Sequence, residues 1–432
     1  MFRTVTSISS LLLAVAILLS GTGLYGTLLA IRGSREGIAD LILGLIMSAY
    51  FVGFLLGTYG CPRIIQRIGH IRAFALFATV ASCTPILHAM FVTPWAWAGL
   101  RIVTGTCLVG LYMIVESWLN AQAPNEHRGQ VFAAYMVVNF LALAIGQNLL
   151  LLYSPMGFEL FGLVAVLISL ALAPVAMTRI EQPTPVHAPR LKLADLFRTT
   201  PAGMAGALGS GLAMGAFWGM GPVLAQRLGL GAVGVAGFMT AAILGGAALQ
   251  WPIGRWSDRH DRRFVLAAVT AGGALSALLA GFVAPHSLPL LFACMFLFGG
   301  LGFTIYSISV AHANDRLAAD QLLQGASSML LVHGVGAAIG PTLAGLWIHG
   351  LGPIGLMVHF AVVLVATSLY VRLQLPPRDE AEPHPATFVP MVRTTPAALE
   401  MIAPEAGDLP DEAPPETAAA AAAAPTRGSA TS

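Results

Sequence analysis

The sequence comprises 432 residues, of which 56% are hydrophobic and 10% charged, and its formal net charge is +2. A soluble domain carries about 25% charged residues, so this composition excludes an ordinary soluble fold and makes lipid the solvent for most of the chain. The four cysteines form no CxxC pair, and we expect no metal site, no cofactor and no nucleic-acid partner.

Apolar runs of about 20 residues recur along the chain, and each could cross the hydrocarbon core of a bilayer as a helix. A spanning segment must satisfy its own backbone hydrogen bonds in lipid, so helices are expected throughout. The first run is longer than the apolar core of a signal peptide, which predicts a retained transmembrane helix. In chain order, the twelve predicted helices cover residues 8–31, 41–61, 71–91, 95–118, 130–153, 156–178, 202–226, 231–253, 264–284, 287–311, 324–349 and 352–375.

Basic residues predict the orientation of these helices. The connections on one side hold sixteen Lys and Arg residues, whereas the other side holds only Arg32, Arg35 and Arg227. Lys and Arg concentrate in cytoplasmic loops, so both termini are predicted to be cytoplasmic. The expected location is a bacterial inner membrane, crossed many times by a chain that we expect to be monomeric.

The polar connection at 179–201 divides the runs six and six. We therefore predict an N-terminal six-helix bundle (1–178), a cytoplasmic linker (179–201), a C-terminal six-helix bundle (202–376) and a cytoplasmic tail (377–432). The tail is acidic and rich in Pro and Ala. We expect it to be disordered because it offers nothing apolar to bury.

The two halves of the sequence resemble each other. "PRIIQRIGHIRAF" (62–74) aligns with "GRWSDRHDRRFVL" (254–266) at an offset of 192 positions, and "GLIMSAYFVG" (44–53) aligns with "GFMTAAILGG" (237–246) at 193. "AIGQ" (144–147) aligns with "AIGP" (338–341) at 194. These similar offsets predict two equivalent bundles, the arrangement of transporters whose substrate site lies between repeats.

The charged loop between the eighth and ninth runs carries a recognisable pattern. Its G-x-x-x-D-R-x-G-R-R spacing, with a weaker copy between the second and third runs, resembles the signature loop of the major facilitator superfamily. The segments "VESWLN", "NEHRGQVFAAYMVVNFLALAIGQ" and "LQWPIGRWSDRHDRRFVL" resemble its YcaD-like branch. The resemblance covers residues 1–376 and implies an all-helical membrane fold of twelve helices in two pseudo-symmetric bundles.

In that superfamily the loop is a conformational latch rather than a substrate site. The resemblance implies that Gly254 allows close helix approach and that Asp258 faces the positive amino end of a neighbouring helix. Arg259, Arg262 and Arg263 would then pair with acidic groups or lipid phosphates. Plain positive-inside charge is the alternative, and it explains the arginines but not the position of Asp258.

The sequence also departs from this pattern. Asp261 takes the place of the motif's glycine in the second copy. In the first copy Gln66 replaces the aspartate, and only Arg67, Gly69 and a shifted Arg72 remain. A glutamine cannot make the same charge interaction, so we expect a weaker latch in the first copy.

The fourth run places ionisable side chains on one helical stripe. At about 100° per residue, Gly105, Tyr112 and Glu116 fall about 40°, 20° and 60° from Arg101. Ionisable groups at depth in a membrane favour a functional interpretation. We expect Arg101 to bind substrate, with snorkelling to the outer headgroups as the alternative.

Glu116 lies near the cytoplasmic end of the same run, and we expect it to pair with Arg67 or Arg63 as part of the latch. Asp40 and Glu159 fall near outer helix ends, where we expect solvated side chains. Other polar residues within the spans are candidates for contact with substrate, although each alone is more often an interhelical contact. With Arg101 and Tyr112, these candidates are Tyr25, Asn139, Gln147, Trp218, Tyr306 and His333.

"GVGAAIGPTLAG" (334–345) has the spacing of small residues that permits close helix contact. It resembles the Gly-Pro motif of drug–proton antiporters, but those carry the motif in the fifth helix, which reads "AIGQN" here. The first run also lacks a carboxylate that could accept a proton. An antiporter assignment is therefore weakened, and proton coupling stays open.

The leading hypothesis is a secondary transporter that moves a small organic solute by alternating access, with the solute, membrane lipid and, where transport is coupled, protons as its partners. A membrane-embedded enzyme is one alternative, but no HExxH, GxSxG or Walker sequence is present, and we predict no enzymatic activity. A receptor or scaffold that does not transport is the other alternative. It would be favoured if the polar groups within the membrane proved dispensable.

Overall fold

The structure is a computed structural model that describes residues 2–123, 127–177, 191–318, 321–374, 388–389 and 391. These residues belong to one compact unit that ends at Ile402. Most of the predicted tail, and the predicted linker up to residue 190, lie outside the described residues. The described part of the linker forms a short helix, α8 (Leu193–Thr199), which packs on α9 and α13.

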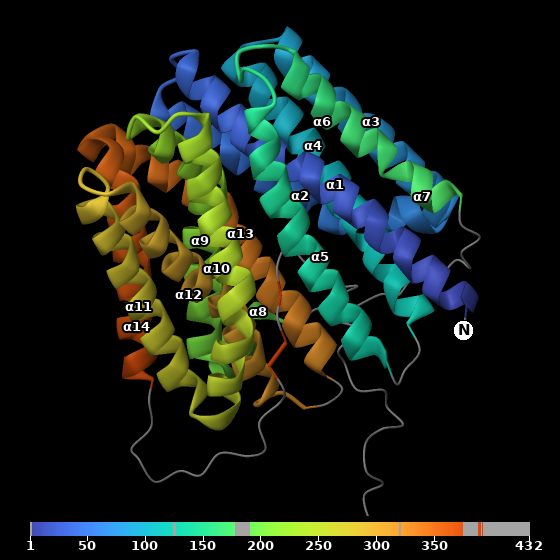
Figure 1. Cartoon of the computed structure of the whole chain (residues 1–432). Helices are drawn as coiled ribbons and strands as arrows, with labels where there is room; N and C mark the ends of the chain where they lie inside the picture. The colour runs from blue at the N-terminus through green and yellow to red at the C-terminus, as the bar shows by residue number, and fades with distance from the viewer. Residues whose placement is uncertain are drawn as a thin grey trace, which may run out of the picture. The chain divides into compact units, whose positions relative to one another are not determined.

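The first bundle is formed by the helices drawn from blue to green in Figure 1. A single 3-10 turn, Leu149–Leu151, extends its fifth long helix. The bundle consists of α1 (Phe2–Arg35), α2 (Asp40–Ile68), α3 (His70–Met90), α4 (Pro94–Gln122), α5 (Arg128–Asn148), α6 (Glu159–Leu170) and α7 (Leu172–Ala176).

The second bundle lies beside the first in Figure 1. The 3-10 turn Gly352–Ile354 separates its last two helices. The bundle consists of α9 (Pro201–Arg227), α10 (Ala232–Arg259), α11 (Arg262–Val283), α12 (Leu288–Asn314), α13 (Leu322–Leu351) and α14 (Gly355–Leu373).

These helices confirm the predicted fold class. The described residues contain eleven helical segments that are long and apolar enough to cross a membrane, and the last of them, Leu322–Leu373, comprises both α13 and α14. With α13 and α14 counted separately, the described residues contain twelve such segments, which follow the order of the predicted runs. No β-strand occurs among the described residues.

The two bundles use the same pairing of helices. In the first, α1 packs on α5, α2 on α4 and α3 on α6; in the second, α9 packs on α13, α10 on α12 and α11 on α14. Each pair in one bundle corresponds in order along the chain to a pair in the other. The equivalence of halves that the sequence offsets predict is thus present in the packing.

Glycines at matching places explain the tightest of these pairs. A Cβ on Gly105 of α4 would overlap the carbonyl oxygen of Tyr50 in α2, and a Cβ on Gly299 of α12 would overlap the carbonyl oxygen of Ala242 in α10. Only glycine permits helix backbones to approach so closely. Gly105 therefore sets the distance between α2 and α4.

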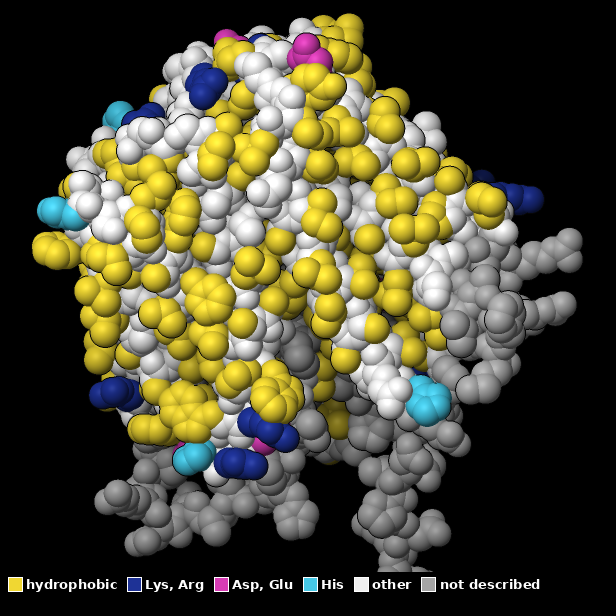
Figure 2. Space-filling view, in the orientation of Figure 1, with side chains coloured by type: hydrophobic (Ala, Val, Ile, Leu, Met, Phe, Trp, Pro, Cys, Tyr) yellow, Lys and Arg dark blue, Asp and Glu magenta, His cyan; other side chains and the backbone are white. Residues whose placement is uncertain are grey.

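The face drawn in Figure 2 carries its apolar side chains across the middle and its charged side chains toward two ends. Large exposed hydrophobic residues occur on helices of both bundles, including Leu56, Val137, Leu275 and Leu369. Apolar area of this extent would be unfavourable in water but is what a helix presents to lipid. The surface agrees with a multi-pass membrane protein.

Candidate functional site

A cavity of about 100 Å³ lies between the two bundles. α2 of the first bundle lines it, together with α9, α12 and α13 of the second. Its walls are mainly aromatic and aliphatic, with Phe54 on one side and Phe303 on the other. Ser210, Tyr306 and His333 add polar groups at a few points, the mixture that is typical of sites for organic ligands.

Tyr306 and His333 lie next to each other in this wall. Their ring centroids are 4.7 Å apart, at an interplanar angle of 48°. Tyr306 is 6% exposed, and its hydroxyl has no hydrogen-bond partner among the described residues. A buried hydroxyl normally has a partner, so this group is available to a molecule in the cavity.

Trp218 lines both the main cavity and a second, smaller cavity of about 20 Å³. Its ring packs 5.7 Å from that of Phe303, centroid to centroid. The smaller cavity is lined by Tyr25, Arg101 and Tyr50, among others. Tyr50 also lines the main cavity, so the two spaces share walls.

Arg101 lies in this smaller cavity with 6% of its surface exposed. Its guanidinium carbon is 4.5 Å from the centre of the Tyr50 ring, where the negative face of the aromatic ring attracts a cation. This contact follows from the packing of α2 on α4. Gly105 lies one turn after Arg101, and because it has no side chain, the α2 backbone at Tyr50 can approach α4 closely. The sequence did not suggest Tyr50 as a partner, and its place on the helix facing Arg101 emerges only from the fold.

Hydrogen bonds hold Tyr25 in place. Its hydroxyl oxygen lies 2.8 Å from Nδ1 of His88 and donates to Thr84 Oγ1 at 3.3 Å. Thr104 of α4 in turn donates to Thr84 at 2.9 Å, so the network joins α1, α3 and α4. His88 is fully buried within this network.

Three of the predicted substrate residues line neither cavity. Asn139 donates to the backbone carbonyl of Tyr135 at 2.7 Å. Gln147 accepts a hydrogen bond from Thr27 at 2.6 Å and donates to a carbonyl of α1. Tyr112 is buried within the first bundle. Asn139 and Gln147 therefore make contacts within and between helices, which was the alternative interpretation of these residues. The predicted substrate residues that do line a cavity are Tyr25, Arg101, Trp218, Tyr306 and His333.

The expected ion pair between Glu116 and an arginine of the first loop is wrong. Glu116 is fully buried and accepts a hydrogen bond of 2.8 Å from the Tyr135 hydroxyl, whereas Arg63 and Arg67 are exposed. The helical stripe placed Glu116 on the face of Arg101 and Tyr112, but it could not show that Tyr135 of α5 donates a hydrogen bond to it.

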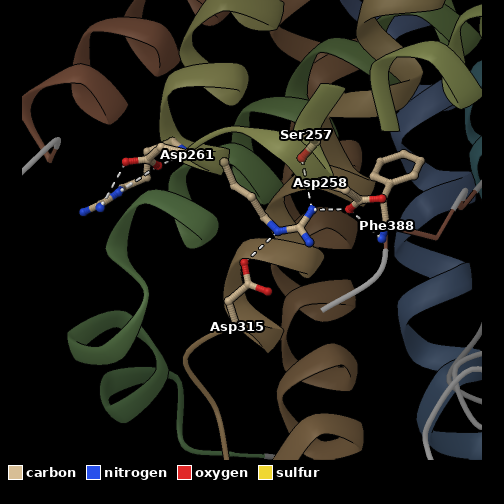
Figure 3. Close-up of polar contacts among 7 residues, drawn as sticks. Ser257, Asp258, Asp261, Asp315 and Phe388 are labelled. Atoms are coloured by element: carbon tan, nitrogen blue, oxygen red, sulfur yellow. Dashed lines mark hydrogen bonds and ion pairs between the residues drawn. The ribbon is translucent and has the colours of Figure 1, made fainter. Parts of the chain in front are cut away.

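In the second loop, Arg262 is the centre of a buried polar network (Figure 3). Its Nε donates to Asp315 at 2.6 Å, and its Nη1 donates to Asp258 and to Ser257, each at 3.1 Å. Arg262 is 3% exposed, so several polar groups together stabilise a charge that lipid or water does not reach. Arg263 pairs with Asp261 at 3.2 Å, and Arg259 is exposed.

Among the described residues, Asp258 does not contact the amino end of a neighbouring helix as expected. Asp258 instead accepts hydrogen bonds from Arg262 and from the backbone N–H of Phe388, the latter at 2.9 Å (Figure 3). Gly254 lies against the Phe388 ring, with which a Cβ at this position would overlap. The motif's glycine thus makes room for an aromatic side chain rather than for a helix.

The two copies of the loop turn in different ways. Gly69 has φ of 81°, and its N–H caps α2 by donating to Ile65 at 2.8 Å. Asp261 has φ of −53° and caps α11 by accepting from the Arg263 N–H at 2.8 Å. A side chain is tolerated in the second copy because its turn does not need the left-handed conformation.

The bundles meet closely at the end of the cavity that the sequence predicts to be external. Ser48 of α2 and Thr342 of α13 lie 2.8 Å apart, Oγ to Oγ1, and a Cβ on Gly345 would overlap the Asp40 carbonyl oxygen. Asp40 is also ion-paired with Arg227 at 2.6 Å. Asp40 is 5% exposed, so the expectation of a solvated side chain is wrong; the close contact predicted for 334–345 is confirmed.

Comparison with known proteins places the chain among transporters. The family model described as "Major Facilitator Superfamily" matches residues 11–248 and 203–403. An "Uncharacterized MFS-type transporter" of Yersinia pestis (strain Pestoides F) is 30% identical over 329 residues, 74% of this chain and 83% of the relative. The "Uncharacterized MFS-type transporter YcaD" of Salmonella paratyphi A is 25% identical over 398 residues, 90% of this chain and all of the relative.

Solved structures share the fold at low sequence identity. A mutant of the nucleoside transporter NupG aligns with a TM-score of 0.73 at 11% identity, covering 86% of this chain and 100% of that one. A bacterial homologue of the human lysosomal transporter Spinster, in an inward-facing and unoccupied conformation, aligns with a TM-score of 0.67 at 15% identity, covering 86% and 95%. At such identities the likeness concerns the fold alone.

Proposed function

The chain belongs to the major facilitator superfamily, and from this premise we propose that it is a secondary transporter that moves a small organic solute through the cavity between its bundles. Because it belongs to this superfamily, the chain is a multi-pass membrane transporter. The substrate class, the residues that bind it and the alternating-access mechanism are the parts that we propose.

The observation that carries the proposal is a cavity lined by both bundles and closed at one end by direct contacts between them. α2 supplies one wall, and α9, α12 and α13 supply the others. At the end that the sequence predicts to be external, Ser48–Thr342 and Asp40–Arg227 join the bundles. Alternating access requires such contacts to form in one conformation and break in another.

The lining favours an amphipathic solute with an anionic group. Trp218 and Phe303 offer aromatic surface in the main cavity, and the Tyr306 hydroxyl offers a hydrogen bond. Arg101 places a guanidinium beside the same space, next to the smaller cavity. A buried guanidinium keeps its proton, so the anionic end of a solute would be attracted to it while the apolar part packs on Trp218.

Transport is best tested with purified protein in liposomes, by counterflow of a panel of organic acids, amines and neutral solutes, with and without a pH gradient. The proposal expects exchange of at least one amphipathic organic acid. Dependence of net uptake on the pH gradient would indicate proton coupling. If the protein shows a thermal unfolding transition, and is therefore folded, but exchanges no solute of the panel, a receptor or scaffold would be favoured instead.

Two variants connect the transport to this cavity. Tyr306→Phe removes only the buried hydroxyl and should raise the KM by about tenfold if that group binds the solute. Tyr112→Phe removes a hydroxyl that is equally buried but lies away from both cavities, so it should leave transport unchanged. Equal effects of the two variants would argue against this cavity as the binding site.

A further inference from the structure

Three described residues of the C-terminal segment, Phe388, Val389 and Met391, lie against the second bundle. Phe388 is 8% exposed and Met391 is 6% exposed. Their burial differs from the expectation that residues 377–432 offer nothing to bury. The difference comes from a short apolar island, "FVPMV" (388–392), within an otherwise polar and Pro- and Ala-rich tail.

The first contact of this segment is with the latch loop. The N–H of Phe388 donates to Oδ1 of Asp258 at 2.9 Å (Figure 3). The Phe388 ring packs against Gly254. A hydrogen bond to a carboxylate is stronger than one between neutral groups. The segment therefore occupies the aspartate and the glycine that the resemblance assigned to contact with a neighbouring helix.

The second contact lies at the cavity itself. The N–H of Met391 donates to Ser307 Oγ of α12 at 3.0 Å, and the side chain lines the main cavity beside Tyr306. Val389 packs between these two anchor points. Two backbone donors and two buried side chains thus hold the segment in one position.

The volume that remains beside Met391 is small. Sites for organic ligands span about 300–1,000 Å³, whereas the main cavity measures about 100 Å³ with Met391 in its wall. We call the contact between Ser48 and Thr342, at the end predicted to be external, the seam. The contact of Phe388 with Asp258 lies at the opposite end of the helices, because Asp258 is at the carboxyl end of α10, where the loop predicted to be cytoplasmic begins. The segment therefore narrows the cavity from the end opposite the seam.

From these contacts we infer that Phe388, Val389 and Met391 form a plug, an internal ligand of this chain that docks on Asp258 and Ser307 and competes with substrate for the main cavity. While it is docked, the cavity cannot hold a solute of ordinary size and the latch loop cannot move onto another partner. Release of the segment is then a step that precedes binding from that side. The plug is a means of inhibition within the chain.

A disulfide test of its position needs no substrate. In a variant whose four native cysteines are replaced by alanine, Ser307→Cys with Met391→Cys should form an intramolecular disulfide on mild oxidation of the full-length protein in lipid nanodiscs. Thr342→Cys with Met391→Cys is the matched control, because Thr342 lies at the seam, and it should not cross-link. Equal yields for the two pairs, or none for the first, would overturn the docking.

A labelling test measures whether the docked segment covers the cavity. Leu330→Cys, whose parent residue lines the cavity, is reacted with a charged maleimide in the same nanodiscs. Phe388→Pro removes the N–H donor to Asp258 and should raise the labelling rate by about tenfold, the change expected for one lost hydrogen bond to a charged acceptor. Phe388→Leu keeps the donor and an apolar side chain, and should label near the parent rate.

Deletion of residues 388–391 separates a plug from a purely structural contact. It should raise labelling at Leu330→Cys at least as much as Phe388→Pro, while labelling at the exposed Thr199→Cys of α8 stays unchanged. Unchanged labelling at Leu330→Cys in both variants would overturn the plug. A parallel rise at Thr199→Cys would do so as well, because it would indicate general loosening.

Discussion

The ion pair between Asp40 and Arg227 provides a direct test of alternating access. It joins the start of α2 in the first bundle to the end of α9 in the second, with Asp40 Oδ1 2.6 Å from Arg227 Nη2. Asp40→Asn keeps the size and shape of the side chain but removes its charge. The change should weaken the closed end of the cavity and increase the population of molecules in which that end is open.

The size of this effect follows from the burial of the pair. Exposed ion pairs contribute about 0–1 kcal/mol, and breaking a fully buried pair costs about 3–5 kcal/mol. The Asp40 side chain is 7% exposed and that of Arg227 is 36% exposed, so solvent screens one partner only. We expect a loss of about 1.5 kcal/mol, which corresponds to a roughly tenfold shift between the two conformations.

The assay is the reactivity of a cysteine in the smaller cavity, Thr22→Cys, in a variant whose native cysteines are replaced by alanine. A maleimide that does not cross membranes is added to intact cells, so that it enters only from outside. Asp40→Asn should raise the labelling rate about tenfold. The charge exchange Asp40→Arg with Arg227→Asp should return most of the rate toward that of the parent.

The same experiment can refute the reasoning in two ways. If Asp40→Asn leaves labelling unchanged while the protein remains folded, the seam does not control access. If labelling requires broken cells, the predicted orientation is reversed. Failure of the charge exchange to restore the rate would show that packing of Asp40, rather than its charge, holds the bundles together.

Three further predictions concern the site, the packing and the buried network. Arg101→Lys keeps the charge but loses the planar guanidinium over Tyr50, and should raise the KM for an anionic solute about tenfold with little change in KM for a neutral one in the counterflow assay. Gly105→Leu should abolish stable folding, measured as monodisperse protein on gel filtration, because its side chain would overlap the α2 backbone, whereas Gly60→Ala, with open space at its Cβ, should be tolerated. Arg262→Met should lower stability by about 3 kcal/mol in thermal unfolding, and adding Asp315→Leu should recover part of it, since the second change removes the carboxylate that has lost its ion pair with Arg262.

Much of the fold could be predicted from the sequence because the bilayer restricts the possibilities. Each spanning segment must be a helix of sufficient length, so the twelve apolar runs located the helices directly. The offsets near 192 positions revealed the equivalent halves, because matching glycines such as Gly105 and Gly299 make matching helix contacts. These features depend on local composition or on repeats, which a single sequence contains.

Features that depend on which helix faces which were harder to predict. Glu116 was expected to pair with Arg63 or Arg67 of the loop, but it is buried and accepts a hydrogen bond from Tyr135 of the next helix. Asp40 was expected to be solvated because it begins a helix, yet the second bundle covers it. A pattern along one helix gives the direction of a side chain relative to its neighbours in sequence, but not the identity of the surface opposite.

The tail shows a different limit. The prediction for residues 377–432 rested on average composition, and two buried residues, Phe388 and Met391, do not alter an average over 56 positions. The signal was the apolar island around Phe388, and its importance depends on the contact of the Phe388 ring with Gly254 and on the hydrogen bond that Asp258 accepts from the Phe388 N–H. Neither could be known before the loop was placed.

The halves of this protein are equivalent in packing but have diverged in chemistry. The first bundle contributes a buried cation, Arg101, beside the cavity, while its copy of the latch loop turns through Gly69 and leaves Arg67 exposed. The second bundle contributes a carboxylate, Asp258, that accepts from Arg262 and from the chain's own C-terminal segment. A solute held by Arg101 and a segment held by Asp258 would therefore bind opposite bundles of one cavity. Each would exclude the other through shared volume rather than shared polar contacts, so changes at Arg101 should alter solute binding without altering the docking of the segment.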